Sequence, residues 1–230
     1  MVCPSSRRGA AYPPRQPFTA MFMAPTELRG HPPTARAMVS NVDSARRKAT
    51  YEDLLKVPDT MVAEILDGEL YATPRPASPH ALAASAIGID LGGPFHRAPN
   101  GPEQPGGWWI LFEPELHLGA DVVVPDVAGW RREKMPVLPN VAAFTQAPDW
   151  ACEVVSPATA GADRVRKMRI YARESVGHLW LVEPLAKTLE VYRLQNEQWV
   201  VAGTHGGSEH VRVEPFEAIE LDLTRWWLEP

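Results

Sequence analysis

Two carboxylates and a lysine in the middle of the chain are of the types that metal-assisted hydrolysis requires. Asp126 follows Pro125, where an apolar run ends, and Glu153 lies within another apolar run, Cys152–Val155. A buried carboxylate without a partner costs several kcal/mol, so Glu153 is expected to be paired, metal-bound or excluded from the core. Carboxylate oxygens bind Mg²⁺, and a lysine such as Lys167 can orient a metal-bound water or offset charge on a phosphate. The three residues therefore fit Mg²⁺- or Mn²⁺-assisted phosphodiester hydrolysis by an activated water.

A helix is predicted over residues 162–175, directly after the second apolar run, with Gly177 as its cap. Asp163, Lys167 and Tyr171 recur at i, i+4 and i+8, which places them on one face of this helix. A neighbouring apolar stripe should dock on the sheet and consists of Val165, Met168 and Ala172. The helix is thus expected to bring Lys167 close to the strands.

Each of the three candidate residues also has an ordinary structural explanation. Glu153 can be a strand residue that pairs with Arg164 or Lys167. Asp126 can be a turn former, which is a common role for aspartate after proline. Lys167 can be a solvated charge or the partner of Asp163 in an i, i+4 pair. The spacing alone leaves both interpretations open.

The remaining patterns predict a mixed sheet with helices packed on it, an α/β (α+β) fold. Thr50 followed by Asp53 forms a capping box for a short helix, and Asp67–Gly68 predicts a tight hairpin turn. Residues 80–91 are rich in alanine and predict a helix that ends before Gly92–Gly93. Further strands are expected at residues 108–118, 120–130, 178–184, 188–194, 199–203 and 210–214.

The bulk composition is that of an ordinary globular chain, 45% hydrophobic and 22% charged. Residues 1–45 are rich in Pro and Arg and lack apolar periodicity, which predicts a disordered tail, and residues 46–230 are expected to form a single domain. No run reaches the roughly 18 apolar residues of a membrane helix. Cys3 and Cys152 can build neither a disulfide framework nor a zinc site, so a reducing cytoplasm is the simplest location.

The net charge of −5 argues against a general nucleic-acid coating protein, because such proteins neutralise phosphates with an excess of Lys and Arg. An acidic body is compatible with a metal site, since carboxylates that bind Mg²⁺ add negative charge. Several tryptophans are expected in the core or an interface rather than as base-stacking platforms, namely Trp108, Trp109, Trp180, Trp226 and Trp227.

A series of motifs in a fixed order runs from Pro148 to Leu194. It comprises Glu153-Val154-Val155-Ser156-Pro157, Asp163, Lys167, Tyr171-Ala172 and Trp180-Leu181-Val182-Glu183-Pro184. In this order the motifs closely resemble the Uma-type restriction endonucleases, a bacterial family of the PD-(D/E)XK nuclease superfamily. Upstream, the stretches TYEDLLKVPD, EILDGELY, SPH and VVVPDVAGW, the last of which contains Asp126, also match the family in order. The resemblance covers roughly residues 48–194 and implies a restriction-endonuclease-like core with helices on a central mixed sheet.

The resemblance implies that Asp126 and Glu153 are the metal-binding carboxylates. The signature lysine of the superfamily stands two residues after the glutamate, and Val155 occupies that position here. The resemblance then implies that Lys167 supplies the lysine from the following helix. Asp126, Glu153 and Lys167 are therefore the predicted catalytic residues.

Three further residues are candidates for the same site. Glu64 can face it from the first hairpin, as related nucleases often add a carboxylate early in the fold; the alternative is an exposed residue before the turn. His80 matches a histidine of the family, and is either a helix-start residue, a group behind the ligands or a phosphate contact. Tyr171 shares the helix face of Lys167.

The expected function is that of a Mg²⁺-dependent DNA endonuclease. DNA is the expected substrate, and a homodimer is expected by analogy with restriction-type nucleases that cut both strands. The alternative is a catalytically silent nuclease fold that binds DNA or protein, which Val155 and the acidic body favour. A two-carboxylate glycosidase fits poorly, because it leaves the helix-borne Lys167 unexplained.

Overall fold

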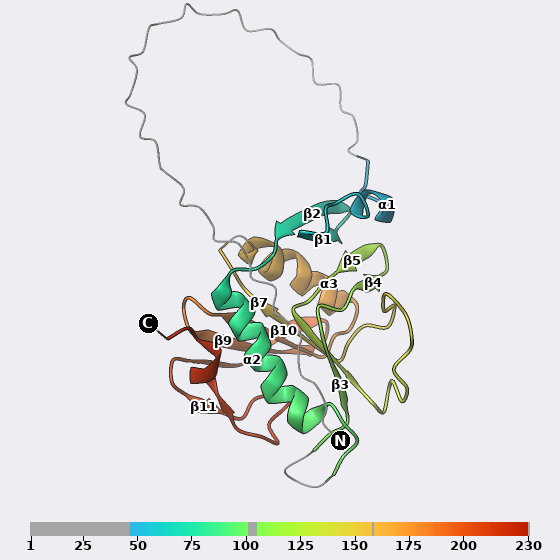
Figure 1. Ribbon diagram of the computed structural model, residues 1–230. Coiled ribbons are helices and arrows are strands. Elements are labelled where there is room, and N and C mark those ends of the chain that lie inside the picture. The colour runs from blue at the N-terminus through green and yellow to red at the C-terminus, as the bar shows by residue number, and fades with distance from the viewer. Residues whose placement is uncertain (1–46, 101–104, 158, 230) are drawn as a thin grey trace, which may run out of the picture. The chain divides into compact units, whose positions relative to one another are not determined.

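A six-stranded mixed sheet forms the centre of the computed structural model, which describes residues 47–100, 105–157 and 159–229 (Figure 1). Its strand order is β10-β9-β8-β7-β6-β3, and only β7 and β8 of these neighbours are parallel. The strands are β3 Trp108–Phe112, β6 Val127–Arg131, β7 Trp150–Val154, β8 His178–Glu183, β9 Thr188–Gln195 and β10 Gln198–Gly206. The predicted mixed α/β architecture is confirmed. The predicted tail, residues 1–45, lies outside the described residues, and the single domain over 46–230 stays a prediction.

A second sheet of four strands, in the order β2-β1-β5-β4, holds the N-terminal hairpin. Asp67 and Gly68 both have positive φ, 55° and 82°, as a two-residue hairpin turn requires, so the predicted hairpin is confirmed. Thr50 and Asp53 form the predicted capping box of a short helix. The elements here are α1 Tyr51–Leu54, β1 Met61–Leu66, β2 Glu69–Pro74, β4 Leu116–Leu118 and β5 Asp121–Val123. A two-stranded sheet of β11 His210–Val211 and β12 Leu221–Asp222 precedes the 3₁₀ helix η2, Leu223–Trp226.

Helix α2 spans Ser78–Phe95 and runs through Gly92–Gly93, so the prediction that it ends before these glycines was wrong. Leu91 and Phe95 lie one turn apart and are almost completely buried. Burying a large apolar side chain such as that of Phe95 is worth about 1.5–3 kcal/mol, which offsets the roughly 1 kcal/mol that each of the two helical glycines costs. Packing therefore extends the helix past the residues that local propensity marks as its end.

The crossover between the parallel strands β7 and β8 is helical, as parallel pairing requires. It begins with the π-helix η1, Ala162–Lys167, and continues as α3, Met168–Arg173. The chain leaves this helix at Ser175, where φ is 61°, rather than at Gly177 as predicted. Val165 is 57% exposed and does not dock on the sheet, because the helix instead buries Asp163 and Lys167 against it.

Strand β7 is buried on both faces, and its alternate residues contact two separate cores. Cys152 and Val154 belong to the core that contains α2, together with the buried tryptophans Trp108, Trp150, Trp180, Trp226 and Trp227. Ala151 belongs to the core that contains Ile170 and Tyr171 of α3. Helices α2 and α3 thus cover opposite faces of the sheet, and Glu153 points toward α3.

No helix formed by the described residues is long and apolar enough to cross a membrane.

Candidate active site

Three carboxylates surround the ammonium group of Lys167 between the sheet and the η1–α3 helix. The Lys167 Nζ lies 2.9 Å from Glu153 Oε2 and 2.9 Å from Glu64 Oε1. It also lies 3.6 Å from Asp163 Oδ1 and donates a hydrogen bond of 3.2 Å to the carbonyl oxygen of Val124. Lys167 is only 5% exposed and Glu153 only 2%. The structure therefore brings the predicted lysine and glutamate into direct contact.

The local backbone explains why Lys167 reaches Glu153. Asp163 and Lys167 both lie on the π-helical turn, where the Met168 N–H donates to the carbonyl of Asp163 five residues earlier. Single π-helical turns occur frequently at functional sites. One turn later the Tyr171 hydroxyl donates to Glu153 Oε1. The helix face predicted from the spacing thus holds both oxygens of Glu153.

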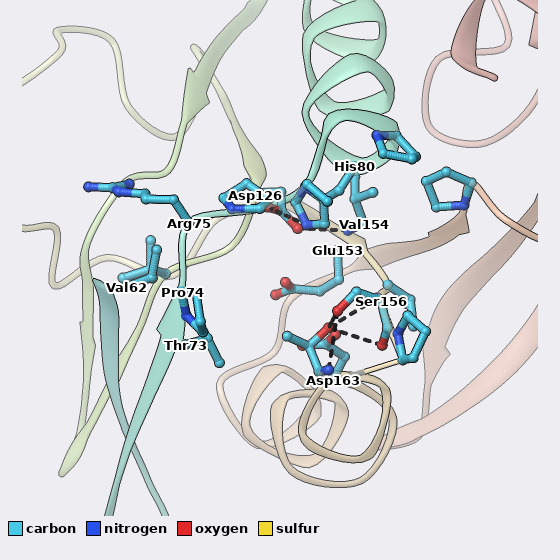
Figure 2. Close-up of a pocket in the computed structure, with 18 of the residues that line it drawn as sticks. Val62, Thr73, Pro74, Arg75, His80, Asp126, Glu153, Val154, Ser156 and Asp163 are labelled. Carbon is cyan, nitrogen blue, oxygen red and sulfur yellow. Dashed lines mark hydrogen bonds and ion pairs between the residues drawn. The ribbon is translucent and has the colours of Figure 1, made fainter. Parts of the chain in front are cut away.

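Asp126 joins the site from the segment between β5 and β6. Its Oδ2 accepts a hydrogen bond of 2.7 Å from the backbone N–H of Val154, the residue after Glu153. Its Oδ1 lies 3.2 Å from His80 Nε2, in the first turn of α2. The other ring nitrogen of His80, Nδ1, is buried without a hydrogen-bond partner in the described part of the chain. Figure 2 shows Glu153 between Asp126 and His80 on one side and Asp163 on the other.

Glu64 is buried, with 7% exposure, so the alternative of an exposed residue before the turn was wrong. Its Oε1 accepts a hydrogen bond of 2.8 Å from the Val124 N–H in addition to its contact with Lys167. The physical reason is the pairing of β1 with β5 at Ile65 and Val122, which covers this strand. That pairing joins distant segments, and the alternation of residues in β1 alone does not reveal it.

The geometry identifies the partner of Glu153 and shows whether Lys167 is exposed to solvent. Glu153 pairs with Lys167, whereas Arg164 makes two hydrogen bonds of 2.8 Å to Glu190. Lys167 is not a solvated surface charge, because its ammonium is enclosed by acids from three elements. Asp163, which the sequence placed on the same helix face as Lys167, contributes to the same cluster.

The pKa values of the cluster reflect an excess of negative charge. Burial lowers the pKa of Lys167, but the surrounding carboxylates, Glu153 foremost, outweigh this and hold it well above its ordinary value. Burial raises the pKa of Glu153 well above its ordinary value, and Lys167 opposes this shift. Burial likewise raises the pKa of Asp163, again against the effect of Lys167. One lysine thus compensates the buried acids only in part.

His80 responds to the same excess of acids. Burial lowers its pKa, but the hydrogen bond and the charge of Asp126 outweigh burial, so the pKa of His80 lies above its ordinary value. This direction favours an imidazolium that donates to Asp126 and holds its carboxylate in one orientation.

A pocket of about 440 Å³ opens over this cluster. Its base is formed by the acids, with Lys167 and His80, and its mouth includes Arg75 and Glu113, which form an ion pair of 3.0 Å. The Ser156 and Thr159 hydroxyls, linked by a hydrogen bond of 3.1 Å, line it near Asp163. Arg75, Glu113 and Thr159 lie between the regular elements of the structure, and sequence reasoning did not single them out.

The donor chemistry of the pocket base fits a hard divalent cation. Asp126 and Glu153 offer carboxylate oxygens on adjacent elements, and each oxygen retains a lone pair beyond the hydrogen bond that it accepts. In the residues that the structure describes, no three His, Cys, Asp or Glu side chains are arranged to hold a metal ion. A pair of carboxylates leaves the remaining coordination positions to water, as is common for Mg²⁺.

Comparisons with known proteins point to one family and one fold. Residues 49–224 match the model of the Uma2 family, described as "Putative restriction endonuclease". The chain is also similar to the crystal structure of a "putative nuclease belonging to DUF820" from Anabaena variabilis, with a TM-score of 0.62 and 21% identity. That similarity covers 77% of this chain and 97% of the other. The curated proteins include no match.

Proposed function

Because the chain belongs to the Uma2 family of putative restriction endonucleases, we propose that it is a Mg²⁺- or Mn²⁺-dependent endonuclease that hydrolyses DNA phosphodiesters. The observation that carries the proposal is the buried cluster at the base of the pocket, where three carboxylates contact one lysine. Such an excess of buried acid is costly in a folded protein, and a bound cation would offset it.

Asp126 and Glu153 would hold the metal, and a bound divalent ion supplies positive charge at a phosphate and lowers the pKa of bound water. His80 and the Val154 N–H orient the two oxygens of Asp126. Tyr171 and Lys167 orient those of Glu153. Because these hydrogen-bond partners already hold the carboxylates in place, little free energy is spent on reorienting the carboxylates when a ligand binds.

Lys167 has a further role in this proposal. Its raised pKa keeps the ammonium charged, so it can stabilise negative charge on a phosphate that enters the pocket. Lys167 takes the place of the superfamily's signature lysine, because the position two residues after Glu153 is occupied by Val155, a buried apolar residue. The contact of 2.9 Å with Glu153 supports this role for a lysine from the helix.

The test is cleavage of DNA with Mg²⁺ or Mn²⁺ by the wild type and by Asp126→Asn and Glu153→Gln. Both variants keep the side-chain volume and lose a charge, and we expect a loss of activity of at least about 100-fold, as for other electrostatic groups at reacting centres. Glu69→Gln is the matched control, because Glu69 is an acid outside the pocket, paired with Arg166 on the surface. Equal cleavage by all four proteins would contradict the site.

The alternative is a nuclease fold that binds DNA or protein without turnover. One observation favours it: all four oxygens of Asp126 and Glu153 already have partners within the chain. Calorimetric titration with Mn²⁺ separates the two functions. Binding that Glu153→Gln removes supports the nuclease, and absence of binding supports the silent module.

A homodimer remains part of the proposal, by analogy with restriction-type nucleases, which often act as two copies. Light scattering of the full chain in the presence of DNA measures the number of copies directly.

A further inference from the structure

The pocket is lined mainly by apolar surface, to which five prolines contribute. Prolines from three separate segments contribute, and the side chain of Leu185 adds to them from the turn between β8 and β9. The prolines are Pro74, Pro76, Pro79, Pro157 and Pro184. Leu185 is 67% exposed, so a large apolar side chain is accessible to solvent beside a pocket that also contains the charged cluster.

The cations that line the pocket are all committed to acids of the chain. Arg75 pairs with Glu113, His80 with Asp126, and Lys167 with the buried cluster. The arginines on the outer face of the η1–α3 helix are paired as well, Arg164 with Glu190, Arg166 with Glu69, Arg169 with Asp67 and Arg173 with Asp121. Duplex DNA carries one negative charge per about 1.7 Å of its axis and one strand about half as much, so surfaces with few uncommitted cations favour the single strand over the duplex.

The depth of the acids sets a second limit on the substrate. Glu64, Glu153 and Asp163 are each at most 7% exposed, so a phosphodiester must enter the pocket to approach them. A volume of about 440 Å³ falls within the range of pockets that enclose one small organic ligand, about 300–1,000 Å³. Bending a duplex of 20–30 base pairs by 40–90° to bring its backbone into such an opening costs about 1–6 kcal/mol, a cost that a flexible single strand does not incur.

We propose, resting on the proposed nuclease function, that the pocket accepts one unpaired nucleotide, and that the substrate class is single-stranded or locally unpaired DNA. The base lies against the proline wall and Leu185, while the phosphate points to the acids. Apolar side chains, Leu and Pro among them, insert beside bases in other DNA-binding proteins, and enzymes that act on one nucleotide enclose it in an apolar pocket. An unpaired strand enters without the cost of unstacking that a duplex incurs.

The test compares three fluorescent oligonucleotides of one sequence: a single strand, a fully paired duplex, and a duplex with an internal unpaired loop. Their affinities are measured by anisotropy with Ca²⁺ for the full-length wild type and Glu153→Gln, and their cleavage with Mn²⁺ for the wild type. We expect the single strand and the loop to bind at least about tenfold more tightly than the duplex, and cleavage to fall within unpaired segments.

Leu185→Ala tests the wall itself, with Leu55→Ala as the control, because Leu55 is 65% exposed and lies outside the pocket. We expect Leu185→Ala to weaken single-strand binding about threefold to tenfold and to leave duplex binding unchanged, whereas Leu55→Ala changes neither.

Duplex binding as tight as that of the single strand, or equal effects of the two leucine variants, would overturn the inference. Preferential binding of unpaired DNA without metal-dependent cleavage of any oligonucleotide would support the inference and overturn the nuclease function, so the two failures are distinguishable.

Discussion

The inner and outer faces of the η1–α3 helix differ in how their charges are balanced. On the inner face Lys167 contacts three carboxylates, of Glu64, Glu153 and Asp163, and all four side chains are buried. On the outer face Arg164 pairs with Glu190 and Arg169 with Asp67, and both of these acids are at least partly exposed. The same short helix therefore carries a buried excess of acid on one side and balanced surface pairs on the other.

The two faces differ in how much their charges cost the free energy of folding. Exposed ion pairs are each worth about 0–1 kcal/mol, and they are screened by salt. Buried charges without full compensation reduce stability, so their presence in a fold is a signal of a functional site. By this criterion the inner face is the candidate site, and the many arginines of the outer face are not evidence for a DNA-binding helix.

The largest effect is expected from Lys167→Met, which leaves three buried carboxylates without their lysine. We expect a loss of about 3–5 kcal/mol in the free energy of unfolding at neutral pH, because breaking a buried pair leaves uncompensated charge. Urea denaturation measures it. A loss below about 1 kcal/mol would mean that the Lys167 cluster contributes no more to stability than an exposed ion pair does.

The pH dependence of the Lys167→Met variant has a defined sign. Burial raises the pKa of Glu153 and of Asp163 in the folded state, and removal of Lys167 removes the effect that opposes this. Folded carboxyls with raised pKa values bind more protons than the unfolded chain, so stability increases as pH falls toward their ordinary pKa range and is lost as pH rises through the raised values. The stability gap to the wild type should therefore narrow at acidic pH.

A smaller effect is expected from His80→Gln, which weakens the support of Asp126 and leaves the Lys167 cluster intact. Removing a partner of a metal-binding carboxylate typically costs about 10–100-fold in metal affinity. Calorimetric titration with Mn²⁺ measures the loss, and His205→Gln is the control, since His205 lies outside the pocket and pairs with Glu209 on the surface. Unchanged affinity in both variants would remove His80 from the site.

The smallest effect is expected from Arg164→Ala on the outer face, about 0.5–1 kcal/mol in the free energy of unfolding at low salt. The hydrogen bonds from Arg164 lower the pKa of Glu190, so this pair stabilises the fold above the ordinary pKa of a glutamate and the contribution is lost as pH falls through the lowered value. Thermal unfolding of wild type and variant between neutral and acidic pH measures it. A difference that persists at low pH and at high salt would indicate packing by the arginine stem instead.

Local features of the fold follow from the sequence because neighbouring residues decide them. The Thr50–Asp53 capping box and the Asp67–Gly68 turn each involve a few consecutive residues, and both occur as predicted. The end of α2 does not, because the burial of Phe95 against Phe216, far away in the chain, outweighs the local signal of Gly92 and Gly93.

The residues of the candidate site likewise fall into those that the sequence indicated and those that only the tertiary structure brought together. Asp163, Lys167 and Tyr171 could be grouped from the sequence, since one helix face follows from residue spacing, and the order of motifs indicated Asp126 and Glu153. Only the tertiary structure decided that Glu64 is buried against Lys167, because this depends on the pairing of β1 with β5. It also decided that His80 supports Asp126 and that prolines from three segments form one apolar wall above the acids. These contacts join residues far apart in the chain, and their positions are set by the packing of whole elements, which no local pattern encodes.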